Sequence, residues 1–348
     1  MANTVIGLEI TEEGVRAAEV TVGRAPRLVA CGSVPLPPGA AKDSEVFDKD
    51  AVVLALRQLW SRAGIKGKHV VLGIGSRRIL VRDYTTQALR PDLLAQALPY
   101  QVQDLLPVPA DQAVLDFYPV SQEGDQLTGL LVAAVAETVD ELITTVGKAK
   151  LSVDVVDLAP FGLARALNVI ATPGETVAAL HLGEHTTYVV VIRDGVPRFV
   201  RIIPMDIETQ PRPVIGDGGD EPGPAPVLED LLETVPPGEP PMRRRSVARV
   251  AARPAGMTAA AIDDVVARLG STLRFYADRA ADAPVTRVLL SGAGASVDGL
   301  PATLAASLPM PVQVVDLASI VAVKLEMPPL PIALNLVSTV GLALGAHR

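Results

Sequence analysis

The sequence predicts an α/β protein of two related lobes, and three observations support this prediction. The chain has 348 residues, 49% of them apolar, which is enough for two hydrophobic cores. Residues 5–20, "VIGLEITEEGVRAAEV", read as two apolar, β-favouring runs around a turn from Thr11 to Val15, which is a β-hairpin. A similar hairpin returns at residues 177–203, "VAALHLGEHTTYVVVIRDGVPRFVRII". We therefore expect each lobe to open with such a hairpin.

Equal spacing within the two hairpins indicates an internal duplication. When Glu9 is set against His181, the turn glycines Gly23 and Gly195 both fall fourteen positions downstream. The segments that follow end alike, as "APRLV" at residues 25–29 and "VPRFV" at residues 196–200. Shared spacing together with a shared ending favours a duplicated unit over a chance match.

The first half of the chain alternates predicted strands and helices. A third strand is expected near residues 27–36, and a helix over residues 50–64 that Gly64 ends. The apolar face of this helix consists of Val53, Leu56, Leu59, Trp60 and Ala63. The helical pattern at residues 89–109 is expected to break at Pro99 and to close at Pro107 and Pro109. Further strands are expected at 69–75, 113–120 and 127–136, a helix at 137–151, and a strand followed by a helix start at 153–167.

The second half changes character after its hairpin. Residues 206–242 hold nine prolines and nine acidic residues, and an arginine-rich run follows. We interpret residues 206–254 as a linker or large loop, because so few apolar side chains cannot offset the entropy of ordering it. Order returns with a long helix after the N-cap Thr258. A strand, a glycine turn and a helix are then expected at 285–308, and another strand at 312–317.

The apolar stretch at residues 331–348 is expected to be a buried helix. A membrane span needs about 20 predominantly apolar residues, whereas this stretch is shorter and contains Asn335, Ser338 and Thr339. An interfacial anchor would need lysine or arginine on its polar face, and within this stretch neither precedes Arg348.

Charge and cysteine content exclude several classes of protein. The formal net charge of −8 argues against a nucleic-acid groove, which needs a basic surface. The single cysteine, Cys31, can form neither an internal disulfide nor a cysteine-rich metal cluster, which fits a reducing cytoplasm. The start of the sequence lacks the layout of a secretory signal, so no export is expected. His69, His185 and His347 have no metal-ligand spacing, so we expect no metal site.

The ordered segments resemble a known family. Two lobes whose hairpins face a shared cleft, with the glycine turn Gly292-Ala293-Gly294 in the second lobe, resemble the actin-like ATPase superfamily and its ribonuclease H-like core. Over most of the chain, the segments are similar to those of the PilM family of type IV pilus assembly, in the same order. They include "VIGLEITEEGVRAAEV", "LLAQALPYQVQDLLPVP", "VLDFYPV", "GVPRFVRII", "VLLSGAGASVDGLPATLAASLPMPVQVVDL" and "VGLALG". Only residues 206–254 have no counterpart in this resemblance.

The resemblance implies a division of the chain. Lobe I would comprise an actin-like core at residues 1–83 and 152–176, with a small inserted subdomain at 84–151 placed as in the division protein FtsA. Lobe II would comprise residues 177–205 and 255–348, and residues 206–254 would form the Pro-rich linker.

The resemblance also implies a nucleotide site, which the residues present would weaken. Its contacts would be Glu9, Thr11, Glu12 and Glu13 in the first hairpin, His181, Gly183 and Thr186 in the second, and Gly292, Ala293 and Gly294 in the glycine turn. The family has Asp, Gly and small polar residues in the first turn, and a metal-orienting Asp at the position of His181. Two carboxylates beside a triphosphate cost about 4 kcal/mol per close charge pair at an effective dielectric near 20. A neutral histidine cannot replace a carboxylate in orienting hydrated Mg²⁺.

Three of these residues have alternative interpretations. Glu12 and Glu13 could be solvated turn residues of a hairpin that never held phosphate. His181 could pair with Glu9 across the cleft or be satisfied by a backbone carbonyl.

The sequence therefore predicts a scaffold with no catalytic residues, in which binding of ATP and Mg²⁺, the cofactors that the family implies, is weak or lost. The resemblance implies a cytoplasmic protein at the inner face of the membrane that binds the N-terminal tail of a PilN-like membrane partner in a groove of lobe I, with other pilus platform proteins nearby. It would meet the membrane only through partners and bind no nucleic acid. The alternatives are an active actin-like ATPase of the pilus or cell-division machinery, and a small-metabolite kinase with Asp154 or Asp157 as general base.

Overall fold

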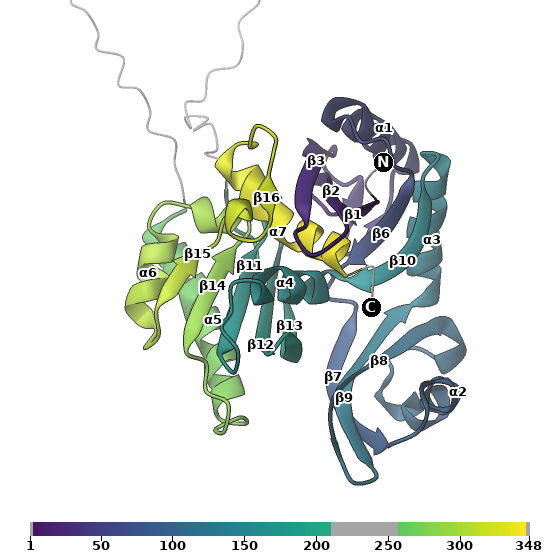
Figure 1. Cartoon of the computed structure of the whole chain (residues 1–348), viewed down its shortest axis with the longest axis vertical. Helices are drawn as coiled ribbons and strands as arrows, with labels where there is room; N and C mark the ends of the chain where they lie inside the picture. Colours follow the sequence, from purple (N-terminus) through teal and green to yellow (C-terminus); the bar gives the residue numbers. More distant parts are fainter. Residues whose placement is uncertain (1–2, 210–256, 346–348) are drawn as a thin grey trace, which may run out of the picture. The chain divides into compact units, whose positions relative to one another are not determined.

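The first sheet contains the N-terminal hairpin. The computed structural model describes residues 3–209 and 257–345. Within these residues, six strands form one mixed sheet (Figure 1) in the order β10 (Ser152–Leu158), β6 (His69–Ile74), β1 (Thr4–Ile10), β2 (Gly14–Thr21), β3 (Arg27–Pro35) and β16 (Ala322–Val323). Strand β1 runs antiparallel to β2 and parallel to β6. The apolar run of β6 is buried from its second residue onward, as expected for a strand covered on both faces.

The second sheet repeats the first. Its order is β13 (Val196–Pro204), β12 (Thr186–Arg193), β11 (Thr176–Leu182), β14 (Arg287–Ser291) and β15 (Val312–Val314). Strand β11 is antiparallel to β12 and parallel to β14, as β1 is to β2 and β6. The register repeats as well, because Glu9 lies opposite Arg16 and His181 lies opposite Tyr188. The duplication predicted from the two hairpins is therefore confirmed.

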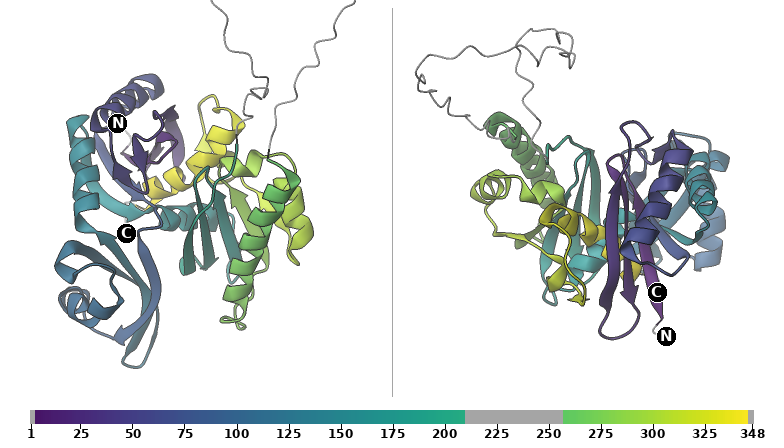
Figure 2. Two further views of the ribbon diagram at one scale, coloured as in Figure 1. Left: turned by 180° about the vertical axis from the view of Figure 1, so that it is seen from behind. Right: turned by 90° about the horizontal axis from the view of Figure 1, so that it is seen from above.

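Helices cover both sheets. Helices α1 (Lys49–Ala63) and α3 (Ala136–Lys148) lie on one side of the first sheet, and α7 (Leu330–Leu344) lies on the other (Figure 2). Helix α4 (Ala159–Asn168) packs against α7 and against β12 of the second sheet. Helices α5 (Ala259–Ala277) and α6 (Leu300–Ser307) belong to the second core. The predicted caps are confirmed: Gly64 ends α1 at a φ of 67°, and the Thr258 hydroxyl accepts the Ala261 N–H.

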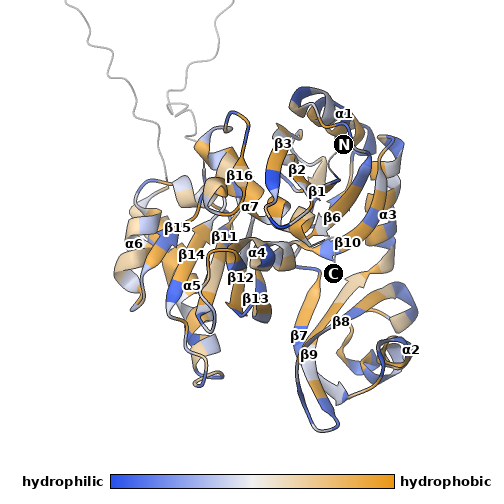
Figure 3. Cartoon of the chain, in the orientation of Figure 1, coloured by the Kyte–Doolittle hydropathy of each residue, from blue (hydrophilic) through white to orange (hydrophobic). Residues whose placement is uncertain are grey.

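Helices α4 and α7 approach each other closely because small residues meet where they cross. A Cβ built on Gly341 would lie 1.8 Å from the Gly162 carbonyl oxygen, so no other residue fits there without moving the helices. Ser338 and Thr339 of α7 are fully buried, and Figure 3 shows the helix as largely apolar. The expectation of a buried C-terminal helix is confirmed. None of the helices within the described ranges is long and apolar enough to cross a membrane.

A small three-stranded sheet extends from the first core. Its order is β7 (Leu80–Gln87), β9 (Gln126–Val135) and β8 (Ala113–Glu123). Helix α2 (Pro91–Gln101) packs on it, followed by the short 3₁₀ turns η1 (Gln103–Leu105) and η2 (Ala110–Gln112). The prediction that Pro99 breaks this helix is wrong. The proline lies inside α2, close to its end, so the hydrogen bond that it removes belongs to the last turn.

The remaining elements are short. Strands β4 (Ala41–Lys42) and β5 (Glu45–Val46) form a two-stranded ribbon, and 3₁₀ turns η4 (Ala293–Ser296) and η5 (Leu317–Ser319) follow β14 and β15. Strand β16 pairs with β3, so the chain returns to the first sheet before α7 begins. The predicted division into lobes and subdomain stays a prediction, and most of the predicted linker, residues 210–254, lies outside the described residues.

Candidate functional site

The first hairpin turn is tight and closed by its own threonine. Both the backbone N–H and the hydroxyl of Thr11 donate to the Gly14 carbonyl, at 2.9 and 3.0 Å. Only residues 11–13 therefore lie between the paired strands, and Glu12 and Glu13 occupy the tip. Glu12 is partly exposed and lies 3.9 Å from the Lys42 ammonium group.

Glu9 lies at the centre of a buried polar cluster beneath this turn. Its Oε2 accepts hydrogen bonds from the hydroxyls of Ser338, at 2.9 Å, and of Thr339, both on α7. The Nε of Arg16 lies 3.9 Å from the same oxygen. Glu9 is 1% exposed and Arg16 is 6% exposed, so the two opposite charges share a site that is shielded from water.

His181 occupies the equivalent place in the second hairpin. Its Nδ1 lies 3.1 Å from the Ser291 hydroxyl, and its ring stacks on Tyr188 with centroids 5.6 Å apart. Both earlier expectations for this residue are therefore wrong, since its hydrogen-bonding partner is neither Glu9 nor a backbone carbonyl. Burial, and after it the positive charge of Arg16, lower the pKa of His181 to about 3. The ring is neutral at physiological pH.

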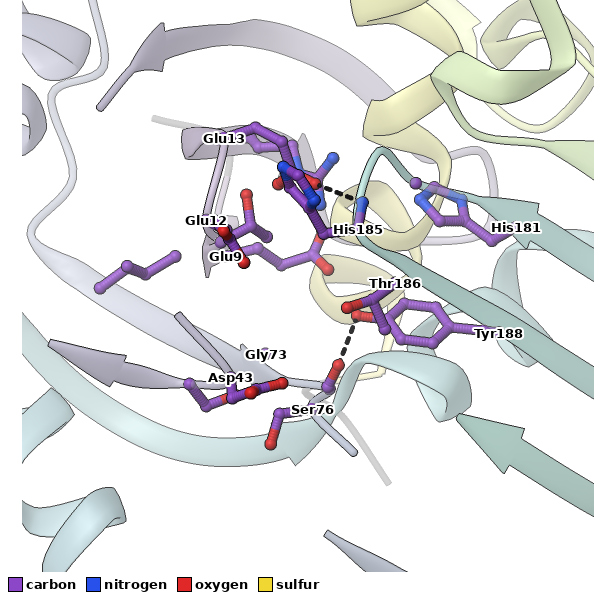
Figure 4. A pocket seen from close by; sticks show the side chains of 16 residues that line it. Glu9, Glu12, Glu13, Asp43, Gly73, Ser76, His181, His185, Thr186 and Tyr188 are labelled. Atoms are coloured by element: carbon purple, nitrogen blue, oxygen red, sulfur yellow. Dashed lines mark hydrogen bonds and ion pairs between the residues drawn. The ribbon is translucent and has the colours of Figure 1, made fainter. Parts of the chain in front are cut away.

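Two hydrogen bonds join the second hairpin to the first sheet, one at the first hairpin turn and one at the loop after β6 (Figure 4). The Glu13 Oε1 accepts the backbone N–H of His185, at 3.2 Å, and the Tyr188 hydroxyl donates to the Gly75 carbonyl, at 3.1 Å. Burial alone would raise the pKa of Glu13, but Arg16 and a hydrogen bond from Thr11 outweigh it and hold the pKa below its ordinary value. An ionised carboxylate thus takes a backbone N–H of the second turn.

The remaining space is a polar cavity of about 30 Å³. It is lined by residues of both hairpins and of two neighbouring loops, among them Glu9, Glu12, Glu13, Arg16, Asp43, Ser76, His181, Gly183, Thr186 and Tyr188. Four buried polar atoms here have no hydrogen-bonding partner: Glu9 Oε1, Glu13 Oε2, Arg16 Nε and His181 Nε2. A cavity of this size and polarity fits one or two water molecules, whereas small-molecule sites usually exceed about 300 Å³.

The glycine turn lies apart from this cavity. Gly292 has a φ of 86°, and a Cβ there would lie 2.3 Å from the Leu182 carbonyl oxygen. Its N–H donates to the Leu334 carbonyl, at 3.0 Å, and the Ala293 N–H donates to the Asn335 side chain, at 2.7 Å. The protein's own chain therefore packs against Gly292, Ala293 and Gly294, and α7 occupies the N–H groups of Gly292 and Ala293.

The structure brings seven of the ten predicted site residues together and separates three. Glu9, Thr11, Glu12, Glu13, His181, Gly183 and Thr186 line the cavity, whereas Gly292, Ala293 and Gly294 do not. Two further residues that line the cavity, Arg16 and Tyr188, were not predicted from the sequence. Arg16 lies between Glu9 and Glu13, and Tyr188 links the second hairpin to Gly75.

The kinase alternative finds no support in this geometry. Asp154 pairs with His69 at 2.8 Å on the surface, and Asp157 pairs with Arg165. Neither aspartate lines the cavity. Across residues 3–209 and 257–345, no three His, Cys, Asp or Glu side chains cluster closely enough to hold a metal ion.

The neutral state of His181 predicts a measurable acid sensitivity. Below its ordinary pKa of about 6.5 the unfolded chain binds a proton that the folded chain excludes, so stability falls as pH falls. Between about pH 7 and pH 5 this group should remove about 2 kcal/mol from the free energy of unfolding. Urea denaturation at both pH values should show this loss in the wild type and lack it in His181→Gln. An identical pH dependence in the two proteins would contradict the neutral state assigned to His181. His185, whose pKa is raised, is present in both proteins, so its contribution to the pH dependence cancels in the comparison.

A family profile and solved structures show what this chain is similar to. The sequence profile of a family described as "Type IV pilus assembly protein PilM" matches residues 7–202. A solved "PilM-PilN type IV pilus biogenesis complex" resembles the chain with a TM-score of 0.74 and 22% sequence identity, over 99% of this chain and 98% of that one. The ethanolamine utilization protein EutJ from Carboxydothermus hydrogenoformans matches with a TM-score of 0.46 and 13% identity, over 99% and 90%. Together with the duplicated sheets, the match at 0.74 confirms the actin-like two-lobe fold.

Proposed function

Because the chain belongs to the family of the type IV pilus assembly protein PilM, we propose that it is a scaffold of a type IV pilus machine. In this proposal it binds the cytoplasmic N-terminal tail of a PilN-like inner-membrane protein. It is cytoplasmic, lies at the inner face of the membrane through this partner, and contacts other proteins of the pilus platform. The solved complex of a PilM with a PilN supports the choice of partner.

The observation that supports tail binding best is a small apolar groove, of about 10 Å³, where the first core meets the three-stranded sheet. Its apolar lining comes from β6, β9, α3 and the segment before β7: Ile74, Ile79, Ala134, Val135, Val139 and Leu142. Ser44, Ser76, Arg78 and Thr138 form its polar part. In the proposal, one apolar side chain of an extended tail would be anchored at this small groove, while the polar groups beside it bind the tail backbone.

We further propose that the scaffold works without a nucleotide. The residues present do not fit a magnesium-bound triphosphate. Glu13 accepts the His185 N–H, the kind of group that would otherwise bind a phosphate oxygen, and Glu12 adds a second negative charge nearby. His181 is neutral where the family has a carboxylate. The glycine turn is covered by Leu182 and α7.

The experiment is a calorimetric titration with a synthetic peptide of the PilN-like protein's N-terminal tail. Wild-type protein should bind this peptide, and Thr138→Arg should weaken binding by at least about tenfold, because a charged side chain would then fill the apolar groove. Thr138 is half-buried at the start of α3.

The matched control is Thr144→Arg, the same substitution on the exposed side of the same helix. It should bind the peptide as the wild type does. Absence of binding at tens of micromolar peptide would refute the proposed function. Equal weakening by both substitutions would refute the assignment of the groove.

A further inference from the structure

A second groove runs along β13, on the side of that strand away from β12. Two cavities of about 480 and 630 Å³ lie along it, one toward β7 and one toward α5. Both are lined by Arg201, Ile202 and Phe275, so they form one continuous groove. We name it the arginine groove, after Arg82, Arg201, Arg268 and Arg279 in its lining.

The two phenylalanine rings of the groove, Phe199 and Phe275, stack against two of its four arginines, Arg201 and Arg279. The Arg201 guanidinium lies 5.0 Å from the centroid of Phe275 and 5.8 Å from that of Phe199. The Arg279 guanidinium lies 5.3 Å from the Phe275 ring. Phe275 is 41% exposed, so it forms part of the groove wall and not of the core. Stacking of this kind orients the planar guanidinium and leaves its N–H donors free for a carboxylate.

The charge of the groove contrasts with that of the whole chain. The protein has a net charge of −8, yet this lining contains four arginines and one acidic residue, Asp83, which lies 3.6 Å from Arg279. Among the residues that the structure describes, neither Arg82 nor Arg201 has a carboxylate partner within ion-pair distance. Two unpaired guanidinium groups beside an apolar lining complement an acidic ligand that also has apolar side chains.

Within residues 3–209 and 257–345, no strand pairs with the outer edge of β13 or of β7. Strand β13 ends the order of the second sheet, and β7 ends the order of the three-stranded sheet. An edge strand presents free N–H and C=O groups to which an extended peptide can add. Side chains of an added strand alternate, so one face would meet Val81, Ile202 and Leu130 while the other reaches the arginines.

We propose that the arginine groove binds an extended acidic segment of a partner protein, with acidic and apolar residues in alternation. The segment pairs with the edge of β13 and its carboxylates bind Arg201, Arg279 and Arg82. This surface borders the apolar groove proposed for the tail, here called the tail groove, with which it shares Ile79, and it extends away from that groove along β13. The inference stands on the groove's own geometry and does not depend on the identity of the tail.

The test uses the full chain and a short fluorescein-labelled peptide in which glutamate and valine alternate. Fluorescence anisotropy should show saturable binding that weakens with added salt. Arg201→Glu should reduce the affinity by about tenfold or more, the loss of a charge-assisted hydrogen bond. Phe275→Ala should reduce it by about threefold to fivefold, because Arg201 and Arg279 lose their stacking partner.

Arg274→Glu is the matched control, since it makes the same charge change on α5 outside the groove. It should leave the affinity unchanged, as should Thr138→Arg in the tail groove. Equal losses in Arg201→Glu and Arg274→Glu would overturn the proposal, because only net charge would then matter. Binding of single-stranded DNA or of phosphatidylglycerol vesicles in place of the peptide would also overturn it. So would a wild-type dimer that Arg201→Glu dissociates, since the occupant would then be a second copy of the chain.

Discussion

Replacing Arg16 by methionine will lower the free energy of unfolding by about 3 kcal/mol at neutral pH. Arg16 is buried beside Glu9 and Glu13, and its removal leaves their charges without this cation. Breaking a buried ion pair typically costs about 3 to 5 kcal/mol. We expect the lower end, because Glu9 keeps its hydrogen bonds from Ser338 and Thr339.

Urea denaturation at neutral and mildly acidic pH checks this prediction. The deficit should shrink as pH falls, because Arg16 lowers the pKa of Glu13 in the wild type, and without Arg16 this carboxylate can take up a proton in the folded protein. Adding Glu9→Gln to Arg16→Met should recover part of the loss, as expected for two coupled sites. The control Lys42→Met removes the exposed partner of Glu12 and should cost less than about 0.5 kcal/mol. If Arg16→Met lowered the free energy of unfolding by less than about 1 kcal/mol, or by the same amount at both pH values, the account of this cluster would be contradicted.

Replacing Glu12 and Glu13 together by serine will raise the affinity for magnesium-bound ATP by about a hundredfold or more. Each carboxylate close to a phosphate opposes binding by about 4 kcal/mol at an effective dielectric near 20, and screening at the partly exposed Glu12 reduces its share. The substitution also frees the His185 N–H, which Glu13 occupies in the wild type. His181 remains in the variant, and a neutral histidine cannot orient hydrated Mg²⁺ as a carboxylate does. The variant should therefore bind ATP without hydrolysing it.

Fluorescence anisotropy with labelled ATP and Mg²⁺ measures this gain. Glu137→Ser with Asp140→Ser makes the same charge change on the exposed side of α3 and should give no gain. The circular dichroism spectrum and tail binding of the cleft variant should match the wild type, which shows that it is folded. An equal gain in both double variants, or none in either, would contradict the proposed role of Glu12 and Glu13.

The hairpins illustrate how far sequence reasoning reaches. Alternation and spacing predicted two equivalent hairpins, and the two sheets have matching topology. A turn placed from Thr11 to Val15 sets Ile10 opposite Arg16, whereas the structure pairs Ile10 with Val15 and Glu9 with Arg16. Because strand side chains alternate, this one-residue error concealed the Glu9–Arg16 pair. The signal was present in Thr11, whose hydroxyl closes the shorter turn.

Contacts between distant segments were harder to predict. Ser338 and Thr339 were noted as polar interruptions of an apolar helix, and buried hydroxyls require partners. Nothing in the helical period indicated that the partner is Glu9 of the first hairpin. The interpretation of the glycine turn missed a distant contact in the same way. Gly292 was interpreted as leaving space for a ligand, whereas in the structure Leu182 and α7 pack against it.

The two hydrogen bonds between the second hairpin and the first sheet depend on the way the two cores pack. Glu13 was singled out from the sequence, but its acceptance of the His185 N–H requires the two turns to meet. The bond from Tyr188 to Gly75 likewise requires the second hairpin to lie against the first sheet. Sequence periodicity defines the face of each strand and not the distance between two sheets. The sequence therefore predicted that the two turns carry an excess of acidic residues, and it did not predict the hydrogen bonds that close the space between them. That this space is a degenerate phosphate site stays a prediction.

A sequential calorimetric titration of the wild-type protein tests most directly whether this is a scaffold that works without nucleotide. Magnesium-bound ATP is titrated first to millimolar concentration, and the PilN-like tail peptide is then added to the same sample. We predict no saturable heat from ATP and a tail affinity equal to that measured without it. Saturable ATP binding in the low micromolar range, unchanged by Glu12→Ser with Glu13→Ser, or a tail that binds only after ATP, would contradict this account.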